Sequence, residues 1–409
     1  MRLIDKSLLS VVILVILCTT SVDAVLGRTG EMLYETKCGR CHEAPKPNAY
    51  SAEEWPGEVR AMRAQAALTE AQYNDIVDYL TTASAHSSES HGSGPNLGGY
   101  MYTEFFHTQE KQKNWDLHYL AFFVSGWAND RINYFAEFEL EHGGTDDHAF
   151  VEQAYIDFWL TPFVALKVGG FLTPFNRFDE FHGPLQNYTI SRPQMAREIG
   201  VSGWKDVGAS LHGFLPFDDK NSLLFDVYTI NGLGDGSSLR GSRQYRDNNE
   251  NMAFGARASL LLQNTVEIGV SGYHGAWDDD GNLNVNMFGA HVLWPTSVID
   301  YYGEFSKASS ENPAGVDDGD MSGYFVQASR LFPNGVRPTI RYGTLDYLDP
   351  GAEFGRSPRD TDLSELVLSL DYYPTHSTVI KAEYQILMEG SRATSKDNNV
   401  FGLQFALQF

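Results

Sequence analysis

Two cysteines and a histidine, Cys38, Cys41 and His42, form the most chemically specific pattern in this sequence of 409 residues. Their C-x-x-C-H spacing is the attachment pattern of c-type haem. Two thiols one helical turn apart can add to the two vinyl groups of a porphyrin, and the adjacent imidazole can then ligate the iron. We therefore predict one covalently attached haem c, held by these three residues. A disulfide and a partial metal site are the alternative interpretations.

The second axial ligand of the iron is expected in the segment that follows. Met62 is the only methionine between His42 and position 84. A thioether opposite a histidine is the ligand pair of cytochromes with a raised reduction potential, so we predict that Met62 and His42 both bind the iron. Methionine at helical spacing is also an ordinary core residue. His86 and His91, in a polar stretch, are the competing ligands.

Residues 1–24 have the pattern of a secretory signal peptide. Arg2 and Lys6 precede an apolar run, and Ala24 is the small residue expected at a cleavage site. An uncleaved anchor is the alternative. Export fits the haem prediction, since c-type haem is attached outside the cytoplasm, and cleavage would remove Cys18, the third of the three cysteines.

Residues 25–84 are predicted to form a small all-α domain that positions the haem residues. Ser51 and Thr69 each begin a capping pattern that predicts the start of a helix. Apolar residues then recur at helical spacing: Trp55, Val59 and Met62 in one stretch, and Tyr73, Ile76, Val77 and Leu80 in the next. Residues 85–96, rich in Ser, Gly and His, are predicted to be a flexible linker.

From residue 97 to the C-terminus the pattern changes to strict alternation of apolar and polar residues. In 131–142, Tyr134, Phe138 and their neighbours lie on one face of the predicted strand, and Glu137 and Glu139 lie on the other. Repeated segments of about ten alternating residues are typical of a transmembrane β-barrel. We count sixteen such segments, from 97–106 to 399–409 and with 164–172, 201–213 and 222–230 among them, and predict about sixteen antiparallel strands. A soluble β-sandwich is the alternative.

Three loop features could carry further chemistry. Residues 173–200 form a long insertion that either folds inward as a constriction or is an ordinary extracellular loop. The acidic turns 278–282 and 317–320 could capture calcium or ferrous iron, although a solvated loop is the simpler interpretation because no EF-hand is completed. Arg240, Arg243 and Arg246 form a basic cluster, for which a solvated loop tip is the default over an anion site.

The composition excludes some classes of function. Acidic residues number 53 against 30 basic ones, for a formal net charge of −23, which argues against a nucleic-acid partner. We expect this charge to be divided among the haem domain, acidic loops and lumen-facing acids such as Glu137, Glu139 and Glu141, and therefore expect cations rather than anions in the lumen. We find no nucleophile–base constellation of a hydrolytic enzyme.

Two resemblances extend these predictions. The C-x-x-C-H, the loop with Pro45 and Pro47, Trp55 and Met62 resemble short monohaem cytochrome c domains, and the segment from Lys167 to Phe175 resembles one found in phosphate-selective-type porins. A signal peptide, one C-x-x-C-H, a short domain and a 16-stranded barrel together resemble the fused outer-membrane cytochrome–porins of iron-oxidising bacteria.

That resemblance implies electron transfer in the bacterial outer membrane. The haem domain is expected on the periplasmic side or inside the lumen, and the expected partners are outer-membrane lipid, a periplasmic electron carrier, and an extracellular donor or acceptor such as Fe(II). The alternative is a solute-conducting porin whose haem domain serves docking or plugging.

Overall fold

The computed structural model describes most of residues 95–409 and parts of residues 30–86. The described residues are 30, 33–34, 38, 47, 50, 52, 55–62, 68, 70–86, 95–108, 113–129, 131–144, 148–161, 163–181, 183–218, 220–234, 239–243, 245–247, 249–263, 265–296, 298–312, 318–349, 359–375, 377–390 and 398–409. The predicted signal peptide 1–24 and most of the predicted linker lie outside them.

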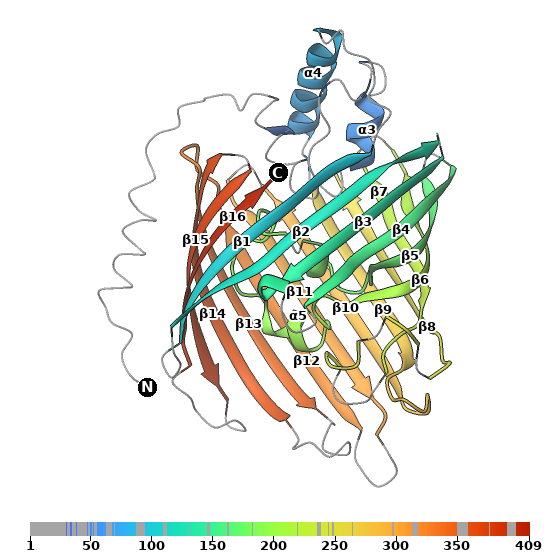
Figure 1. Ribbon diagram of the computed structural model, residues 1–409, viewed down its shortest axis with the longest axis vertical. Coiled ribbons are helices and arrows are strands. Elements are labelled where there is room, and N and C mark those ends of the chain that lie inside the picture. The colour runs from blue at the N-terminus through green and yellow to red at the C-terminus, as the bar shows by residue number, and fades with distance from the viewer. Residues whose placement is uncertain are drawn as a thin grey trace.

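A closed antiparallel barrel of sixteen strands makes up the chain from residue 96 onward (Figure 1). Each strand pairs with its neighbours in sequence, and β1 pairs with β16 to close the ring. The prediction of about sixteen antiparallel strands is therefore confirmed. The strands are β1 (Asn96–Thr108), β2 (Asn114–Asn129), β3 (Ile132–Glu141), β4 (Ala149–Thr161), β5 (Val164–Leu172), β6 (Lys205–Pro216), β7 (Ser222–Ile230), β8 (Ala253–Leu262), β9 (Val266–Ala276), β10 (Asn284–Pro295), β11 (Asp300–Ser310), β12 (Gly319–Ser329), β13 (Val336–Asp349), β14 (Arg359–Thr375), β15 (Thr378–Glu389) and β16 (Val400–Gln408).

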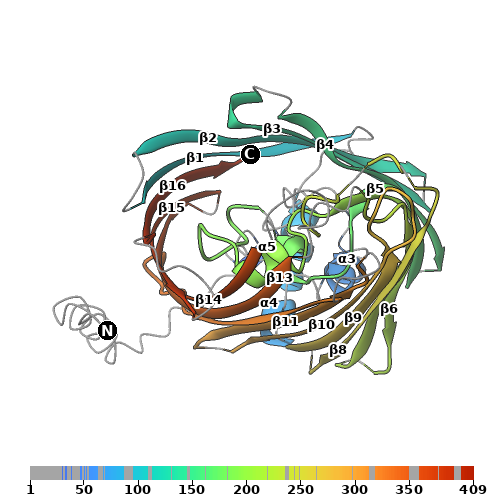
Figure 2. The same ribbon diagram turned by 90° about the horizontal axis from the view of Figure 1, so that it is seen from below.

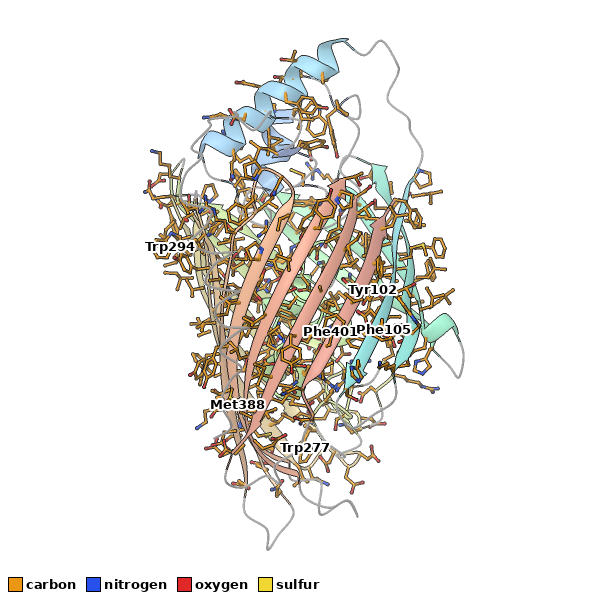
Figure 3. The ribbon with its side chains drawn as sticks, turned by 90° about the vertical axis from the view of Figure 1, so that its left-hand side faces the viewer. Tyr102, Phe105, Trp277, Trp294, Met388 and Phe401 are labelled. Carbon is orange, nitrogen blue, oxygen red and sulfur yellow. The ribbon has the colours of Figure 1, made fainter. Side chains whose placement is uncertain are left out.

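Alternation along each strand separates an apolar outer face from a polar inner face. Phe138 on β3 is 48% exposed, whereas its neighbours Glu137 and Glu139 are each 2% exposed. Trp294 on β10, labelled in Figure 3, is 50% exposed, and Phe401 on β16 is 36% exposed. Large apolar side chains on the outside with buried polar ones inside are the inverse of a soluble protein and match a barrel surrounded by lipid.

The two ends of the barrel differ in loop length. The connection between β2 and β3 is a tight turn, and those from β4 to β5 and from β14 to β15 are equally short. The connections at the other end are longer, such as residues 173–204 and 231–252. The C-terminus lies at the short-turn end (Figure 1), which in bacterial barrels is the periplasmic end.

The long connection between β5 and β6, residues 173–204, lies inside the ring of strands (Figure 2), and we call it the inward segment. It contains the short helices η3 (Phe178–Phe181) and α5 (Gln194–Glu198). The backbone N–H of Thr173 donates to the carbonyl of Trp204 at 2.7 Å and closes the segment at its base. The predicted strand at 201–213 was therefore placed too early, because residues up to Trp204 belong to the inward segment and β6 begins at Lys205.

The predicted small all-α cytochrome c domain is not borne out as a fold. Before the barrel, the described residues contain two principal helices, α3 (Trp55–Met62) and α4 (Glu70–His86), with one helical turn around Leu33. Helical spacing correctly predicted where α3 and α4 lie, but two packed helices do not make up a defined cytochrome domain. Both helices lie beyond the short-turn end of the barrel (Figure 1).

The helices before the barrel nevertheless share one buried apolar cluster. Trp55 and Val59 of α3 pack with Ile76 and Leu80 of α4, and Cys38 belongs to the same cluster with 6% exposure. The Trp55 indole N–H donates to the carbonyl of Pro47 at 2.8 Å. In the described part of the chain, no helix is both long and apolar enough to cross a membrane.

Candidate functional site: the lumen and its inward segment

The first part of the inward segment is fastened by buried carboxylates of the barrel wall. Glu304 on β11 accepts the backbone N–H groups of Arg177 and Phe178 at 2.8 and 3.1 Å. Glu267 on β9 accepts the Arg177 guanidinium Nε–H at 3.1 Å. Burial lowers the pKa of Arg177, but Glu267 and Glu180 outweigh it, so the pKa of Arg177 is raised and the guanidinium stays charged. A bonded charge of this kind holds the chain firmly.

The middle of the segment is held by strands β13 to β15, further along the same arc of the barrel wall. Glu383 accepts the backbone N–H groups of Ile190 and Ser191 at 2.6 and 3.0 Å. Arg341, which is fully buried, donates to the Ser191 carbonyl at 2.8 Å and to a threonine hydroxyl at 2.6 Å. Lys381 donates to the carbonyl of Asn187 at 2.7 Å. Most of the hydrogen bonds that Glu383, Arg341 and Lys381 make with the inward segment therefore go to its backbone.

Helix α5 adds apolar packing to these polar contacts. Met195, Ala196 and Ile199 are buried in one cluster with Phe325 of β12. The Cβ position of Gly323 on β12 would lie 3.0 Å from the Met195 side chain, so any larger residue at 323 would press against α5. The backbone N–H of Gln194 donates to Glu365 on β14 at 3.0 Å. Taken together, these contacts confirm that the insertion folds inward.

The wall formed by β1 to β4 has a different composition. These four strands contain no lysine or arginine, and they carry seven carboxylates, which we call the acidic wall: Glu104, Asp116, Glu137, Glu139, Glu141, Glu152 and Asp157. Neutral groups donate to three of them: the Tyr100 hydroxyl to Glu139 at 2.6 Å, the Gln153 amide to Glu137 at 3.1 Å, and the Gln404 amide to Glu104 at 2.7 Å. Hydrogen bonds from neutral donors stabilise a carboxylate without cancelling its charge.

Arg192 of the inward segment lies on the side that faces the acidic wall. Its guanidinium donates to Ser202 at 2.6 Å and lies 3.4 Å from Asp179. Burial lowers the pKa of Arg192, but the phenol of Tyr119 and the carboxylate of Asp179 outweigh it and raise the pKa. Since Tyr119 is on β2, this interaction relates the segment to the acidic wall. The lumen therefore has a cation on the segment opposite a wall of carboxylates.

The predicted haem residues can be followed only in part. Cys38 is buried in the apolar cluster of α3 and α4, while Cys41, His42 and His91 lie outside the described residues. Met62 is the last residue of α3. His86 is the last residue of α4. The pairing of Met62 with His42 stays a prediction.

Two loop features have structural roles. Asp278, in the predicted acidic turn, accepts the backbone N–H groups of Asn282 and Leu283 at 2.9 and 2.8 Å and so shapes its own turn. Arg243 donates to the carbonyl of Ser202 at 2.8 Å, so it binds the base of the inward segment rather than standing as a solvated loop tip. In the second predicted acidic turn, Asp317 lies outside the described residues, while Asp318 accepts the backbone N–H of Asn312 at 3.4 Å and Asp320 pairs with Lys307 at 3.1 Å.

Sequence reasoning missed the residues that fasten the inward segment. Arg341, Lys381 and Glu383 each sit on the inner face of a strand, where alternation predicts any polar residue. A clue lay in their charge, because a fully buried lysine or arginine needs a partner. Alternation alone could not show that the partner is a backbone segment about 150 to 190 residues away in sequence.

Comparison of the sequence with known proteins identifies a distant relative but no family. No family model matches the sequence. An uncharacterized protein of Aquifex aeolicus is 23% identical over 354 residues, which cover 75% of this chain and 78% of that protein.

Solved outer-membrane proteins share the architecture at low identity. A loop L8 deletion mutant of OmpT from Vibrio cholerae aligns with a TM-score of 0.57 and 13% identity over 77% of this chain and 99% of that one. The anion-selective porin from Comamonas acidovorans aligns with a TM-score of 0.60 and 10% identity over 78% and 99%. Salmonella typhi OmpF, in complex with daunomycin, aligns with a TM-score of 0.52 and 13% identity over 78% and 98%. The chain therefore has a porin-like barrel fold, which supports its location in the outer membrane.

Proposed function

We propose that this chain is an outer-membrane pore that conducts small solutes and prefers cations. The observation that carries the proposal is the acidic wall, with seven carboxylates and no lysine or arginine on β1 to β4. Carboxylates in a wall of low dielectric constant raise the local concentration of cations in the adjoining space. The basic residues Arg341 and Lys381, in contrast, donate to the inward segment. Although one structural neighbour is an anion-selective porin, at 10% identity that likeness concerns the fold alone.

The charge preference can be measured on single channels. The full-length protein, reconstituted in a planar bilayer under a KCl gradient, should show a reversal potential of the sign given by K⁺ permeation. The variant Glu137→Gln with Glu139→Gln keeps the shape of both side chains and should lower the ratio of K⁺ to Cl⁻ permeability by roughly twofold, or about 0.4 kcal/mol. A wild-type pore that prefers Cl⁻, or one without conductance, would refute the proposal.

A second candidate function, electron transfer, is favoured by the spacing of Cys38, Cys41 and His42. We propose that these residues hold one haem c, with Met62 as the second axial ligand, and that the haem exchanges electrons with a periplasmic carrier and an extracellular partner such as Fe(II). The buried, apolar surroundings of Cys38 fit a thioether to a porphyrin. The haem would supply one-electron chemistry, and the chain would attach it and exclude water from it.

Three measurements separate the haem proposal from its alternatives. Protein matured with the c-type haem machinery should carry a covalent haem by mass and by its reduced absorption spectrum, and Cys38→Ser with Cys41→Ser should lose it. Met62→Ala should lose the Met-to-iron charge-transfer band, and retention of that band would move the ligand role to another residue. In intact cells, a membrane-impermeant reductant should reduce the haem. If reduction occurs only after the outer membrane is broken, electron transfer across the membrane is refuted. The remaining interpretation is then a solute pore whose haem segment serves docking or plugging.

A further inference from the structure

A group of potential metal ligands lies at the long-loop end of the acidic wall. Glu141 ends β3, His142 follows it in the short helix η2 (His142–Gly144), and His148 comes just before β4. One ligand atom from each of the three residues lies within 4.8 Å of the other two. Glu141 and His148 are half-buried and His142 is exposed, so an ion could reach the group from solvent.

The backbone brings these three side chains together. The N–H of Glu141 donates to the carbonyl of His148 at 2.8 Å, which fixes the two residues side by side across the loop. His142 adopts a φ of 49°, in the left-handed region that few residues other than glycine occupy. The following Gly143 and Gly144 both have a φ of 74° and complete the reversal of the chain. The strained turn directs His142 back toward His148, with their rings 5.0 Å apart.

A second set of contacts orients the ring of His142. Its Nδ1 lies 2.7 Å from a carboxylate oxygen of Asp116 on β2, and its ring stacks on that of His118 at 5.2 Å. His118 in turn is hydrogen bonded to Glu104. A carboxylate on one ring nitrogen of a histidine fixes the tautomer and leaves the other nitrogen to bind a metal ion, which is the usual outer-shell arrangement of metal-binding histidines.

From this geometry we propose that Glu141, His142 and His148 bind a divalent first-row transition-metal ion, with Asp116 as a positioning residue for His142. Two imidazoles and one carboxylate suit Zn²⁺, Fe²⁺, Co²⁺ or Ni²⁺ and suit Ca²⁺ and Mg²⁺ poorly. Ligands about 2.1 Å from a tetrahedral ion lie roughly 3.4 Å from one another. Nδ1 of His148 and a carboxylate oxygen of Glu141 are already 3.6 Å apart, so only side-chain rotations are needed to form the site.

His142 is exposed to solvent, so an ion bound by this group would be exchangeable. Glu139 and Glu137 follow Glu141 at two-residue intervals along the same face of β3, so the site stands at the outer end of a row of carboxylates. The site would load transition-metal ions at the long-loop mouth of the barrel. This inference rests on the loop residues and does not require the pore to be cation-selective.

The test is metal binding by the purified full-length protein in detergent. Titration with Co²⁺ should give visible absorption bands of a site with nitrogen and oxygen ligands, and Zn²⁺ should displace them while Ca²⁺ should not. His142→Ala and His148→Ala should each weaken binding at least 100-fold, and Asp116→Asn about 10- to 100-fold. The matched control is His274→Ala, an exposed histidine on β9 outside the group, which should bind as the wild type does.

The comparison among variants isolates this site from any ions held by Cys38 and Cys41, because those cysteines are present in every protein tested. Each substituted side chain is at a loop or strand end, and folding is checked by the heat-modifiable mobility of the barrel on gels. Equal Co²⁺ binding by wild type, His142→Ala and His148→Ala would overturn the proposal. So would equal competition by Ca²⁺, since that would assign the ion to carboxylates alone.

Discussion

The two walls of the lumen use charge for different purposes. On β13 to β15, Arg341, Lys381 and Glu383 bind the backbone of the inward segment. On β1 to β4, seven carboxylates stand without any lysine or arginine on the same strands. Charges of the first wall act as structural anchors, whereas we propose that those of the second, apart from Glu152 in its pair with Lys205, act through their field on permeating ions. The role of a charged side chain in the lumen therefore depends on whether the inward segment is bonded to it.

The largest effect is expected from removing an anchor. Arg341→Ala deletes the donor to Thr189 and Ser191 and leaves Glu365, 3.6 Å from the guanidinium, buried without that cation. Breaking a buried charge pair costs about 3–5 kcal/mol. We expect a lower unfolding temperature in detergent and a larger, noisier single-channel current as the segment detaches. Unchanged current and stability would mean that the segment is held by its apolar contacts alone.

A smaller effect is expected from the apolar side of the same attachment. Met195→Ala removes a buried side chain that is 1% exposed and packs in the cluster with Phe325. Truncation of a buried methionine lowers the free energy of unfolding by roughly 2–5 kcal/mol. We expect the low end of this range, because the short helix α5 can shift to fill part of the cavity. Urea unfolding of the barrel should show the loss, while ion selectivity should stay as in the wild type. A change in selectivity would contradict the division between the walls.

Arg192 tests the cation that faces the acidic wall. Arg192→Ala should raise the preference for K⁺ over Cl⁻ by roughly twofold, because it removes a positive charge from the space beside Tyr119. The reversal potential under a KCl gradient gives the ratio. Arg192→Lys, which keeps the charge, is the control and should stay close to the wild type. An unchanged ratio would place Arg192 outside the permeation path, and a fall would contradict the charge effect.

The smallest effect is expected from an exposed ion pair. Lys307 and Asp320 lie 3.1 Å apart on the loop-end parts of β11 and β12, with side chains 49% and 65% exposed. Exposed pairs contribute little to stability. Lys307→Ala should therefore leave both the unfolding temperature and the reversal potential unchanged within error. A sizeable shift in either quantity would show that exposed charges at the loop end also contribute to stability or to ion selectivity.

Much of the barrel could be predicted from sequence, because lipid outside and water inside impose the same alternation on every strand. The strand predicted at 222–230 is found at Ser222–Ile230, and that at 164–172 at Val164–Leu172. The strand predicted at 201–213 began too early because Val201 and Trp204 are apolar residues buried by the inward segment, where local pattern resembles a strand.

The site was harder to predict than the fold. Glu137 and Glu139 were recognised as lumenal acids from alternation alone. The ligand group of Glu141, His142 and His148 went unnoticed, since His142 reaches it through a left-handed turn that no propensity indicates. The all-α domain was wrong as a fold because helical spacing fixes where α3 and α4 lie, but not that two helices amount to a domain.

One set of reversal potentials tests whether the acidic wall sets ion selectivity while the charges on β13 to β15 only hold the inward segment. Wild type, Glu137→Gln with Glu139→Gln, and Glu383→Gln would be compared in planar bilayers under the same KCl gradient. The wild type should prefer K⁺, the double variant of the acidic wall should lose about half of that preference, and the anchor variant Glu383→Gln should keep it. Equal loss in both variants, or none in the double variant, would contradict the central claim.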